Sequence, residues 1–171
     1  MQPRRLILAG LGALLLSGCA GYRLGPVGGH IAGARGIQVP MARNATLEPR
    51  LAEPVTLALR RHIQQDGTFR LETDGAPADL VLETTLLNYE RLPMAFRRED
   101  VVTVTEYELR LTCRVVLRER GVQQPILDQP VSGRTSLLVG PDQTAAERQA
   151  ASLLADDLAR RTVILISEGT W

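Results

Sequence analysis

Histidines and carboxylates are the side chains whose spacing could support catalysis or metal binding in this 171-residue chain. His30 lies in a glycine-rich stretch and His62 in a helical pattern, and neither has the HExxH spacing or the cysteine partners of a metal site. Glu106 and Glu108 would share one face of a strand, but Arg110 falls on that face too, which favours a solvated, charge-balanced surface. No Gly-x-Ser-x-Gly or Walker-type motif occurs in the sequence. We therefore expect no enzymatic activity, no metal site and no cofactor.

Cys19 stands where a covalent lipid would be attached. Arg4 and Arg5 precede an apolar run of about eleven residues, which is typical of a secretory signal because a membrane-spanning helix needs roughly 20. The run ends in Leu16-Ser17-Gly18-Cys19, which matches the bacterial lipobox, where the cysteine receives diacylglycerol before the chain is cleaved on its amino side. The sequence therefore predicts a lipoprotein that is acylated at Cys19, with palmitate among its acyl chains, and anchored to a membrane.

These features divide the chain into three parts. Residues 1–18 are predicted to be the lipoprotein signal peptide. Residues 19–36 are rich in glycine and show no apolar period, so we expect a flexible tether between the lipid and the domain. Residues 37–171 are long enough for one domain with its own hydrophobic core.

Charge and cysteine content narrow the choice of partners. The whole chain has 20 basic and 19 acidic residues and a formal net charge of +1. Cleavage before Cys19 removes Arg4 and Arg5, which leaves 18 arginines and a net charge of about −1. A nucleic-acid-binding protein needs a basic surplus, so we expect no nucleic-acid partner. Cys113 is then the one remaining free thiol, and its place in an apolar alternation predicts a buried side chain without a disulfide.

Arginines beside apolar residues form the candidate binding site. Arg97 and Arg98, with Arg91 nearby, fall between the two longest predicted strands and next to Met94 and Phe96. Guanidinium groups bind phosphate through two parallel hydrogen bonds, so this combination suits an amphiphile that carries phosphates and acyl chains. A plain solvated loop is the alternative.

Apolar periodicity predicts an α+β domain in which two helices pack on one face of a mostly antiparallel or mixed sheet of about four strands. The opposite face of this two-layer sandwich would be free for solvent or a partner. The predicted elements are, in order, a short strand at 37–40, a helix at 54–65, strands at 68–72, 78–90, 101–118 and 126–139, and a helix at 144–167.

Three local features refine this prediction. At roughly 3.3 Å per residue an unbroken strand over 101–118 would be unusually long, so we expect a bend or bulge near 103–105. Pro130 indicates an edge strand or a bulge, because proline cannot donate to a sheet ladder. Thr144 and Glu147 match the capping box of a helix start.

Several segments, taken in their order, resemble the lipopolysaccharide-assembly lipoprotein family LptE. The resemblance covers nearly the whole chain after residue 18 and includes the lipobox and a helix at each end of the strands. The short motifs that carry it are Cys19-Ala20-Gly21-Tyr22-Arg23-Leu24, Ile37-Gln38-Val39-Pro40, Arg43-Asn44-Ala45-Thr46-Leu47-Glu48-Pro49, Val55 to Arg61, Asp66-Gly67-Thr68-Phe69-Arg70-Leu71, Ala78-Asp79-Leu80-Val81-Leu82-Glu83 and Tyr107-Glu108-Leu109.

The resemblance implies an outer-membrane lipoprotein, held on the periplasmic side by its lipid. Such a protein would sit in the lumen of the β-barrel LptD, assist the assembly of that barrel, and contact lipopolysaccharide on its way to the cell surface. Arg91, Arg97 and Arg98 are the local candidates for that contact. The alternative is a lipoprotein subunit of another envelope complex, such as an auxiliary subunit of an ABC-type transporter or an activator of a cell-wall synthase.

Overall fold

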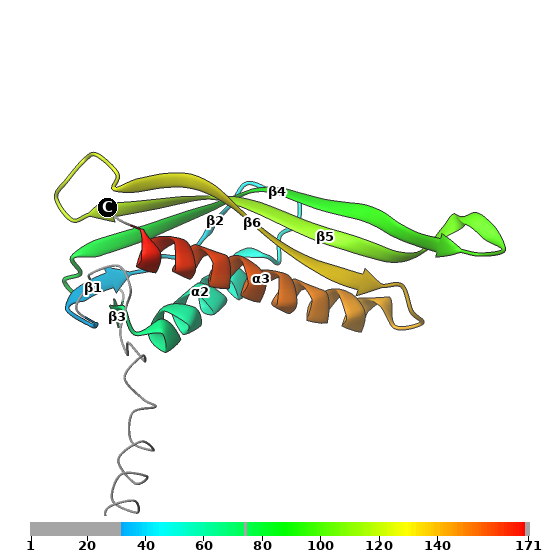
Figure 1. Cartoon of the computed structure of the whole chain (residues 1–171), viewed down its shortest axis with the longest axis horizontal. Helices are drawn as coiled ribbons and strands as arrows, with labels where there is room; N and C mark the ends of the chain where they lie inside the picture. Colours follow the sequence, from blue (N-terminus) through cyan, green and yellow to red (C-terminus); the bar gives the residue numbers. More distant parts are fainter. Residues whose placement is uncertain (1–31, 74, 170–171) are drawn as a thin grey trace, which may run out of the picture.

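The structure is a computed structural model that describes residues 32–73 and 75–169. The predicted signal peptide, Cys19 and most of the predicted tether lie outside these residues. Figure 1 shows an elongated molecule in which long strands lie above two helices. The elements are, in chain order, β1 (Arg35–Gln38), β2 (Arg43–Asn44), α2 (Ala52–Asp66), β3 (Phe69–Glu72), β4 (Leu80–Arg97), β5 (Asp100–Glu119), β6 (Leu127–Leu138) and α3 (Gln143–Glu168).

The strands form one mixed sheet with the order β3-β1-β4-β5-β6, and β2 pairs with β4 beside β1. The three long strands β4, β5 and β6 are antiparallel neighbours, whereas β1 pairs in parallel with both β3 and β4. The predicted α+β class is confirmed. The sheet has six strands where about four were predicted, and β2 was missed because its two residues are too few to show an alternation.

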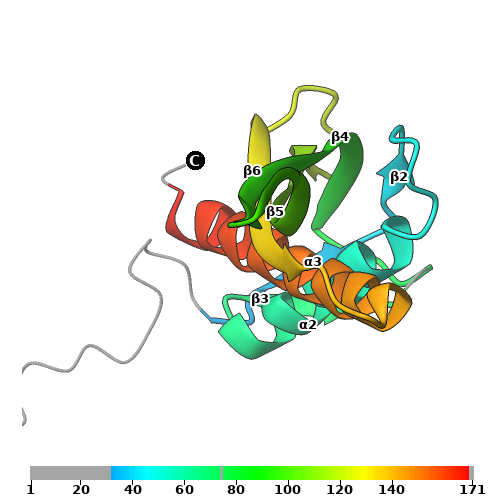
Figure 2. The same ribbon diagram turned by 90° about the vertical axis from the view of Figure 1, so that its right-hand side faces the viewer.

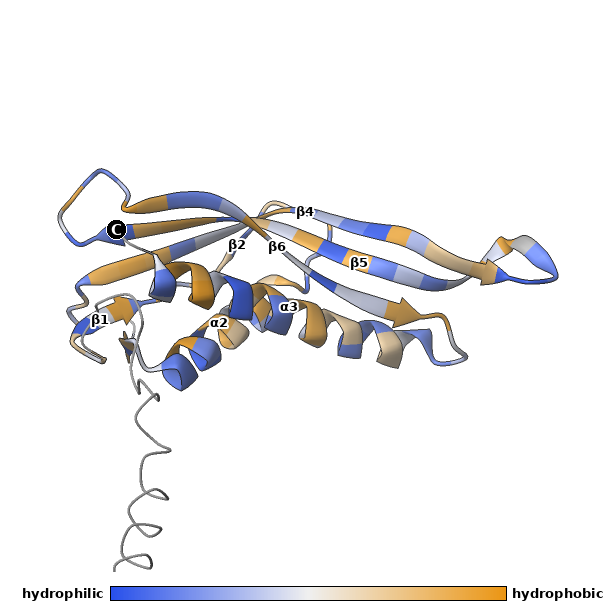
Figure 3. Ribbon diagram, viewed as in Figure 1, coloured by the Kyte–Doolittle hydropathy of each residue, from blue (hydrophilic) through white to orange (hydrophobic). Residues whose placement is uncertain are grey.

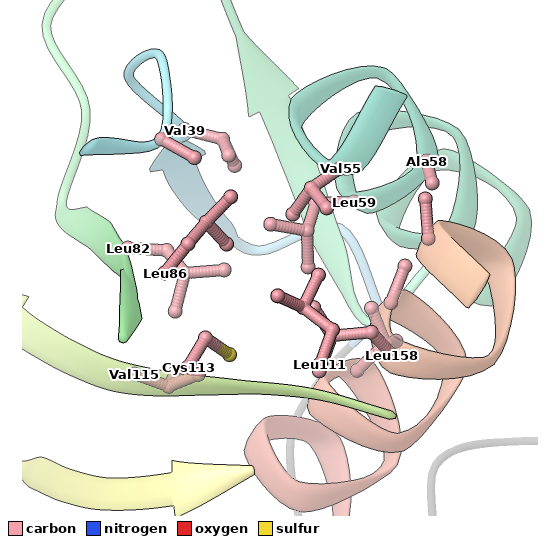
Figure 4. Close-up of a cluster of buried hydrophobic side chains, with 14 of the residues drawn as sticks. Val39, Val55, Ala58, Leu59, Leu82, Leu86, Leu111, Cys113, Val115 and Leu158 are labelled. Carbon is pink, nitrogen blue, oxygen red and sulfur yellow. The ribbon is translucent and has the colours of Figure 1, made fainter. Parts of the chain in front are cut away.

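Both helices cover the same face of the sheet (Figure 2). Helix α2 buries one face that includes Val55, Leu59 and Ile63. Helix α3 buries a stripe that includes Leu154, Leu158 and Ile166. They meet the inward side chains of β4 and β5, among them Leu82, Leu111 and Cys113 (Figure 4). Each large aliphatic side chain that is fully buried in this way contributes about 1.5–3 kcal/mol, so this interface stabilises the fold.

Two predictions about strand irregularity are confirmed. Ala95 of β4 lies opposite Glu106 of β5, whereas the next residue, Phe96, lies opposite Val104, so Thr105 has no Cα partner on β4. This register shift falls within the segment where a bulge was expected. Pro130 lies on β6, which is the edge strand of the sheet. The missing N–H of proline therefore costs the sheet no ladder hydrogen bond at that edge.

The predicted cap of the second helix is wrong by two residues. Asp142, not Thr144, is the N-cap of α3, and its Oδ1 accepts a hydrogen bond from the N–H of Ala145 at 3.0 Å. A carboxylate at this place also interacts favourably with the positive end of the helix dipole, which favours Asp over the neutral hydroxyl. Glu147 instead contacts Gln143 and Arg91.

Adjacent aspartates of α3 connect this helix to the rest of the domain. Asp156 accepts hydrogen bonds from Arg61 at 2.5 Å and from His62 at 2.8 Å, which joins α3 to α2. Asp157 accepts a hydrogen bond from the backbone N–H of Arg134 at 3.0 Å, which joins α3 to the edge of β6. Gly133 allows the close approach at that edge, because a Cβ there would lie 2.8 Å from the backbone N of Leu158.

Candidate functional site

Strands β4 and β5 pass from a covered region into an uncovered one. Along β4, every second residue from Leu80 to Leu86 is buried, whereas no residue from Leu87 to Arg97 is buried. The far part of β4 and its partner segment of β5 project past the N-terminal end of α3 as a hairpin (Figure 1). Beyond Arg91, which contacts Glu147 at the start of α3, the side chains of β4 are exposed or half-buried and are open to solvent.

Exposed apolar side chains and two arginines share the end of this hairpin. Met94, Phe96 and Val102 are 60%, 48% and 82% exposed, and Figure 3 shows apolar segments between the polar ones along both strands there. Arg97 ends β4 and Arg98 begins the turn to β5, and both are exposed. The predicted neighbourhood of Arg97 and Arg98 with apolar residues is thus present in the fold.

Arg91 does not join this group. It lies six residues before Arg97 along an extended strand, which corresponds to roughly 20 Å. Its Nη1 lies 3.1 Å from Oε1 of Glu147 on α3, its Nη2 lies 4.0 Å from Oε2 of Glu48, and its guanidinium stacks over the ring of Tyr89 at 5.6 Å. Partial burial opposes the charged form, but Tyr89 and Glu147 together hold the pKa of Arg91 above its ordinary value. The guanidinium is accordingly engaged within the domain.

A cleft of about 160 Å³ surrounds Arg91, between β4, the start of α3 and the loop before α2. Its walls combine apolar groups with charged ones, and sequence reasoning missed it because its residues come from three distant segments. The signal available in the sequence was Tyr89 and Arg91 on one face of a strand. The residues that line the cleft include Glu48, Leu51, Tyr89, Arg91, Glu147 and Ala151.

The face of the sheet opposite the helices carries paired charges and hydroxyls. Arg114 of β5 donates two hydrogen bonds to Asp128 of β6, at 2.6 and 2.5 Å. These hydrogen bonds hold the pKa of the Asp128 carboxyl below its ordinary value. In the next row the hydroxyls of Thr112 and Ser132 lie 2.9 Å apart. Within the described residues no helix lies on this face (Figure 2), which we call the uncovered face of β4, β5 and β6.

Side chains of the types that ligate metals or act as nucleophiles also occur among the described residues. These residues contain no group of three histidine, cysteine, aspartate or glutamate side chains that could hold a metal ion. Cys113 is fully buried, and this burial raises the pKa of its thiol to about 12, so the thiol stays protonated and is not a nucleophile. None of the described helices is long and apolar enough to cross a membrane.

Solved structures with the same fold include bacterial lipoproteins. A protein from Xanthomonas campestris superimposes with a TM-score of 0.58 at 12% identity, covering 84% of this chain and 90% of that one. A hypothetical protein from Chlamydia trachomatis gives 0.58 at 11% identity, with 80% and 96% covered. A minor lipoprotein from Acinetobacter baumannii gives 0.52 at 16% identity, with 78% and 92% covered. At these identities the likeness shows the fold alone.

No curated protein sequence gives a significant match to this chain. A family model described as "LptE: Lipopolysaccharide-assembly" matches residues 34–164. The match includes all six strands, α2 and most of α3. It therefore extends over the described domain rather than over one motif, and the chain belongs to the LptE lipopolysaccharide-assembly family.

Proposed function

We propose that this protein is an outer-membrane lipoprotein, anchored through an acylated Cys19, that sits inside the barrel of LptD, assists its assembly and helps lipopolysaccharide to reach the cell surface. The observation that carries the proposal is the family match over residues 34–164. An enzymatic role is not part of it, because the matched family is one of lipopolysaccharide assembly.

The two-sided sheet supports a role as a barrel partner. One face is sealed by α2 and α3, and the uncovered face carries fixed hydrogen-bonding groups such as Arg114, Asp128 and Thr112. A broad polar face of this kind, formed by neighbouring strands with no helix over it, suits contact with another protein surface. In the proposed complex, the uncovered face and the strand-connecting loops meet the barrel wall.

The hairpin end supports contact with lipopolysaccharide. Arg97 and Arg98 offer guanidinium groups to phosphates, while Met94 and Phe96 offer apolar surface to acyl chains. Arg91 would contribute separately, through the cleft that it shares with Glu147, to another group of the same large glycolipid. Because the protein has no overall basic surplus, these few side chains would have to supply the phosphate contacts.

Affinity purification of the lipidated protein from a strain that produces LptD tests the first part of the proposal. Recovery of LptD in a fixed ratio is the expected result, and repeated recovery of the protein without LptD in mild detergent would contradict it. Recovery with a transporter or a cell-wall synthase instead would favour the alternative envelope complex. Cys19→Ala should release the protein into the soluble periplasmic fraction, unless LptD itself holds it at the membrane.

Binding of purified lipopolysaccharide to the protein tests the second part. Replacing Arg97 and Arg98 together by alanine should weaken binding, with unchanged thermal unfolding because both side chains are exposed. Arg160→Ala, which removes another exposed arginine, one that pairs with Asp157 on α3, is the control. Equal binding by the double variant and the control would return Arg97 and Arg98 to the status of plain loop residues.

A further inference from the structure

Two arginines lie directly opposite each other on the uncovered face. Arg110 of β5 is the Cα partner of Arg134 of β6, and like charges at such positions repel each other. Thr112 and Ser132 form the next row, two residues along, and their hydroxyls lie 2.9 Å apart. Alternate residues of a strand share a face, so the two arginines point to the same side as the two hydroxyls.

The two arginines differ in how closely carboxylates neutralise their charge. Nη2 of Arg110 lies 2.8 Å from Oε1 of Glu108, and Glu90 occupies the opposite position on β4. Arg134 lies on the edge strand, so no further strand supplies a neighbour on its other side. Among residues 32–73 and 75–169, no carboxylate lies within ion-pair distance of the Arg134 guanidinium. The surplus positive charge of this row therefore resides on Arg134.

The backbone beneath Arg134 is held firmly. Its N–H donates to Asp157 of α3 at 3.0 Å, and Gly133 beside it packs against Leu158. The guanidinium nevertheless extends into solvent, since Arg134 is exposed. By contrast, Arg114 on the same face has its charge taken up by Asp128 within the domain. On this fixed backbone, the uncompensated guanidinium is available to an acceptor from outside.

We propose that Arg134, with Arg110 and the hydroxyl of Ser132 beside it, receives a carboxylate from the protein wall that covers the uncovered face. This inference rests on the proposed function, in which that wall belongs to LptD, and adds a specific contact to it. Charge complementarity selects the occupant, because guanidinium pairs with carboxylate through two parallel hydrogen bonds. Arg110, Ser132 and Arg134 line neither the cleft at Arg91 nor a second hollow at Arg43 and Arg114. This row is therefore open, which suits a protein surface rather than a small ligand.

The test uses the full-length, lipidated protein co-expressed with LptD. A photo-crosslinking residue in place of Ser132 should form a covalent adduct with LptD and identify the facing segment of the barrel. Arg134→Glu should then lower the recovery of LptD by about tenfold or more, and Arg134→Gln should lower it less. Arg120→Glu makes the same charge change in the exposed turn after β5 and should leave recovery unchanged. Replacing the facing carboxylate of LptD by arginine should restore recovery with Arg134→Glu.

Other outcomes would overturn this contact without touching the proposed function. If the wild-type protein recovers LptD and Arg134→Glu recovers as much, the contact is absent. If Arg134→Gln abolishes binding of purified lipopolysaccharide in the absence of LptD, the acceptor is a phosphate instead. A lower melting temperature of Arg134→Gln would mean that the arginine serves the fold, because relief of repulsion should leave stability unchanged or raised. If the wild-type protein does not recover LptD, the proposed function itself fails.

Discussion

The first seven residues of β4 and its last eleven belong to the same strand but to different kinds of surface. The first part, where the helices cover the sheet, alternates buried and half-buried residues, and the second part has no buried residue at all. Stability therefore resides in the covered region and accessibility in the projecting one. Substitutions in the projecting region should therefore change the stability of the domain less than substitutions in the covered region.

Truncation of one buried and one exposed side chain should show the largest contrast. Leu111→Ala removes a fully buried side chain from β5 and should destabilise the domain by about 2–5 kcal/mol, through lost burial and the cavity left behind. Met94→Ala on the projecting hairpin should change stability by less than about 0.5 kcal/mol. Urea unfolding of both variants measures the difference, and equal losses would show that the hairpin is packed in the same way as the core.

Replacing each of two glycines by alanine should give a smaller difference in stability. Gly133→Ala places a Cβ 2.8 Å from the backbone N of Leu158, so α3 must shift and the domain should lose about 1–3 kcal/mol. Gly140→Ala, in the loop before α3, meets nothing within 4 Å and should be close to neutral. Thermal unfolding of the two variants in parallel gives the comparison. A neutral Gly133→Ala would mean that α3 can move away from β6 freely.

Replacing two aspartates that accept backbone hydrogen bonds should give a smaller difference in stability. Asp142→Ala leaves the first N–H groups of α3 without their acceptor and should cost about 1 kcal/mol. Asp100 accepts hydrogen bonds from the N–H of Val102 and the hydroxyl of Thr103 at the hairpin end. Asp100→Ala should alter that turn with a smaller loss of global stability, because few packed residues depend on it. The denaturant midpoints of the two variants show which one loses more stability.

The smallest expected difference between the two regions is in how their aspartates affect stability at low pH. The hydrogen bond from His62, with a further one from Arg61, holds the pKa of Asp156 below its ordinary value of 3.8. A lowered folded-state pKa gives stability that is present above pH 3.8 and is lost as the pH falls through the folded value. Asp156→Asn should therefore flatten the acid limb of the stability curve. Asp100→Asn removes a lowered pKa on the hairpin. It should flatten the curve less, because Asp100 is exposed and solvent screens its interactions; a larger effect of Asp100→Asn than of Asp156→Asn would contradict this expectation.

Local pattern was sufficient for most of the fold. The alternation over residues 101–118 predicted β5 to within one residue at each end, because one face is dry and the other polar along its whole length. Its excessive length predicted the irregularity at Thr105. The start of α3 was misassigned because Thr144 and Asp142 both offer oxygens to a helix terminus, and the choice depends on backbone geometry.

The candidate site was predictable only where its residues are close in sequence. Arg97 and Arg98 were found beside Met94 because they are neighbours in the chain. The contact of Arg91 with Glu147 joins residues 56 positions apart, and no local pattern indicates it. The opposition of Arg110 and Arg134 depends on the register between β5 and β6, which is fixed by the core face rather than by the arginines.

Leu87 decides which side of the molecule Arg91 faces. Leu86 pairs with Cys113 and Asn88 with Thr112, so Leu87 is an extra residue that has no counterpart on β5. Side chains alternate along a regular strand, and this insertion moves the phase of the following residues by one step, as far as the next irregularity at Met94. Tyr89 and Arg91 consequently turn towards α3 and not towards the arginines of the opposite face. A chain without Leu87 would keep Tyr89 opposite Leu111 in regular pairing, so both faces would stay as they are. Pairing Leu87 itself with Thr112, with no bulge, would instead turn the following residues of β4 over and take Arg91 away from Glu147.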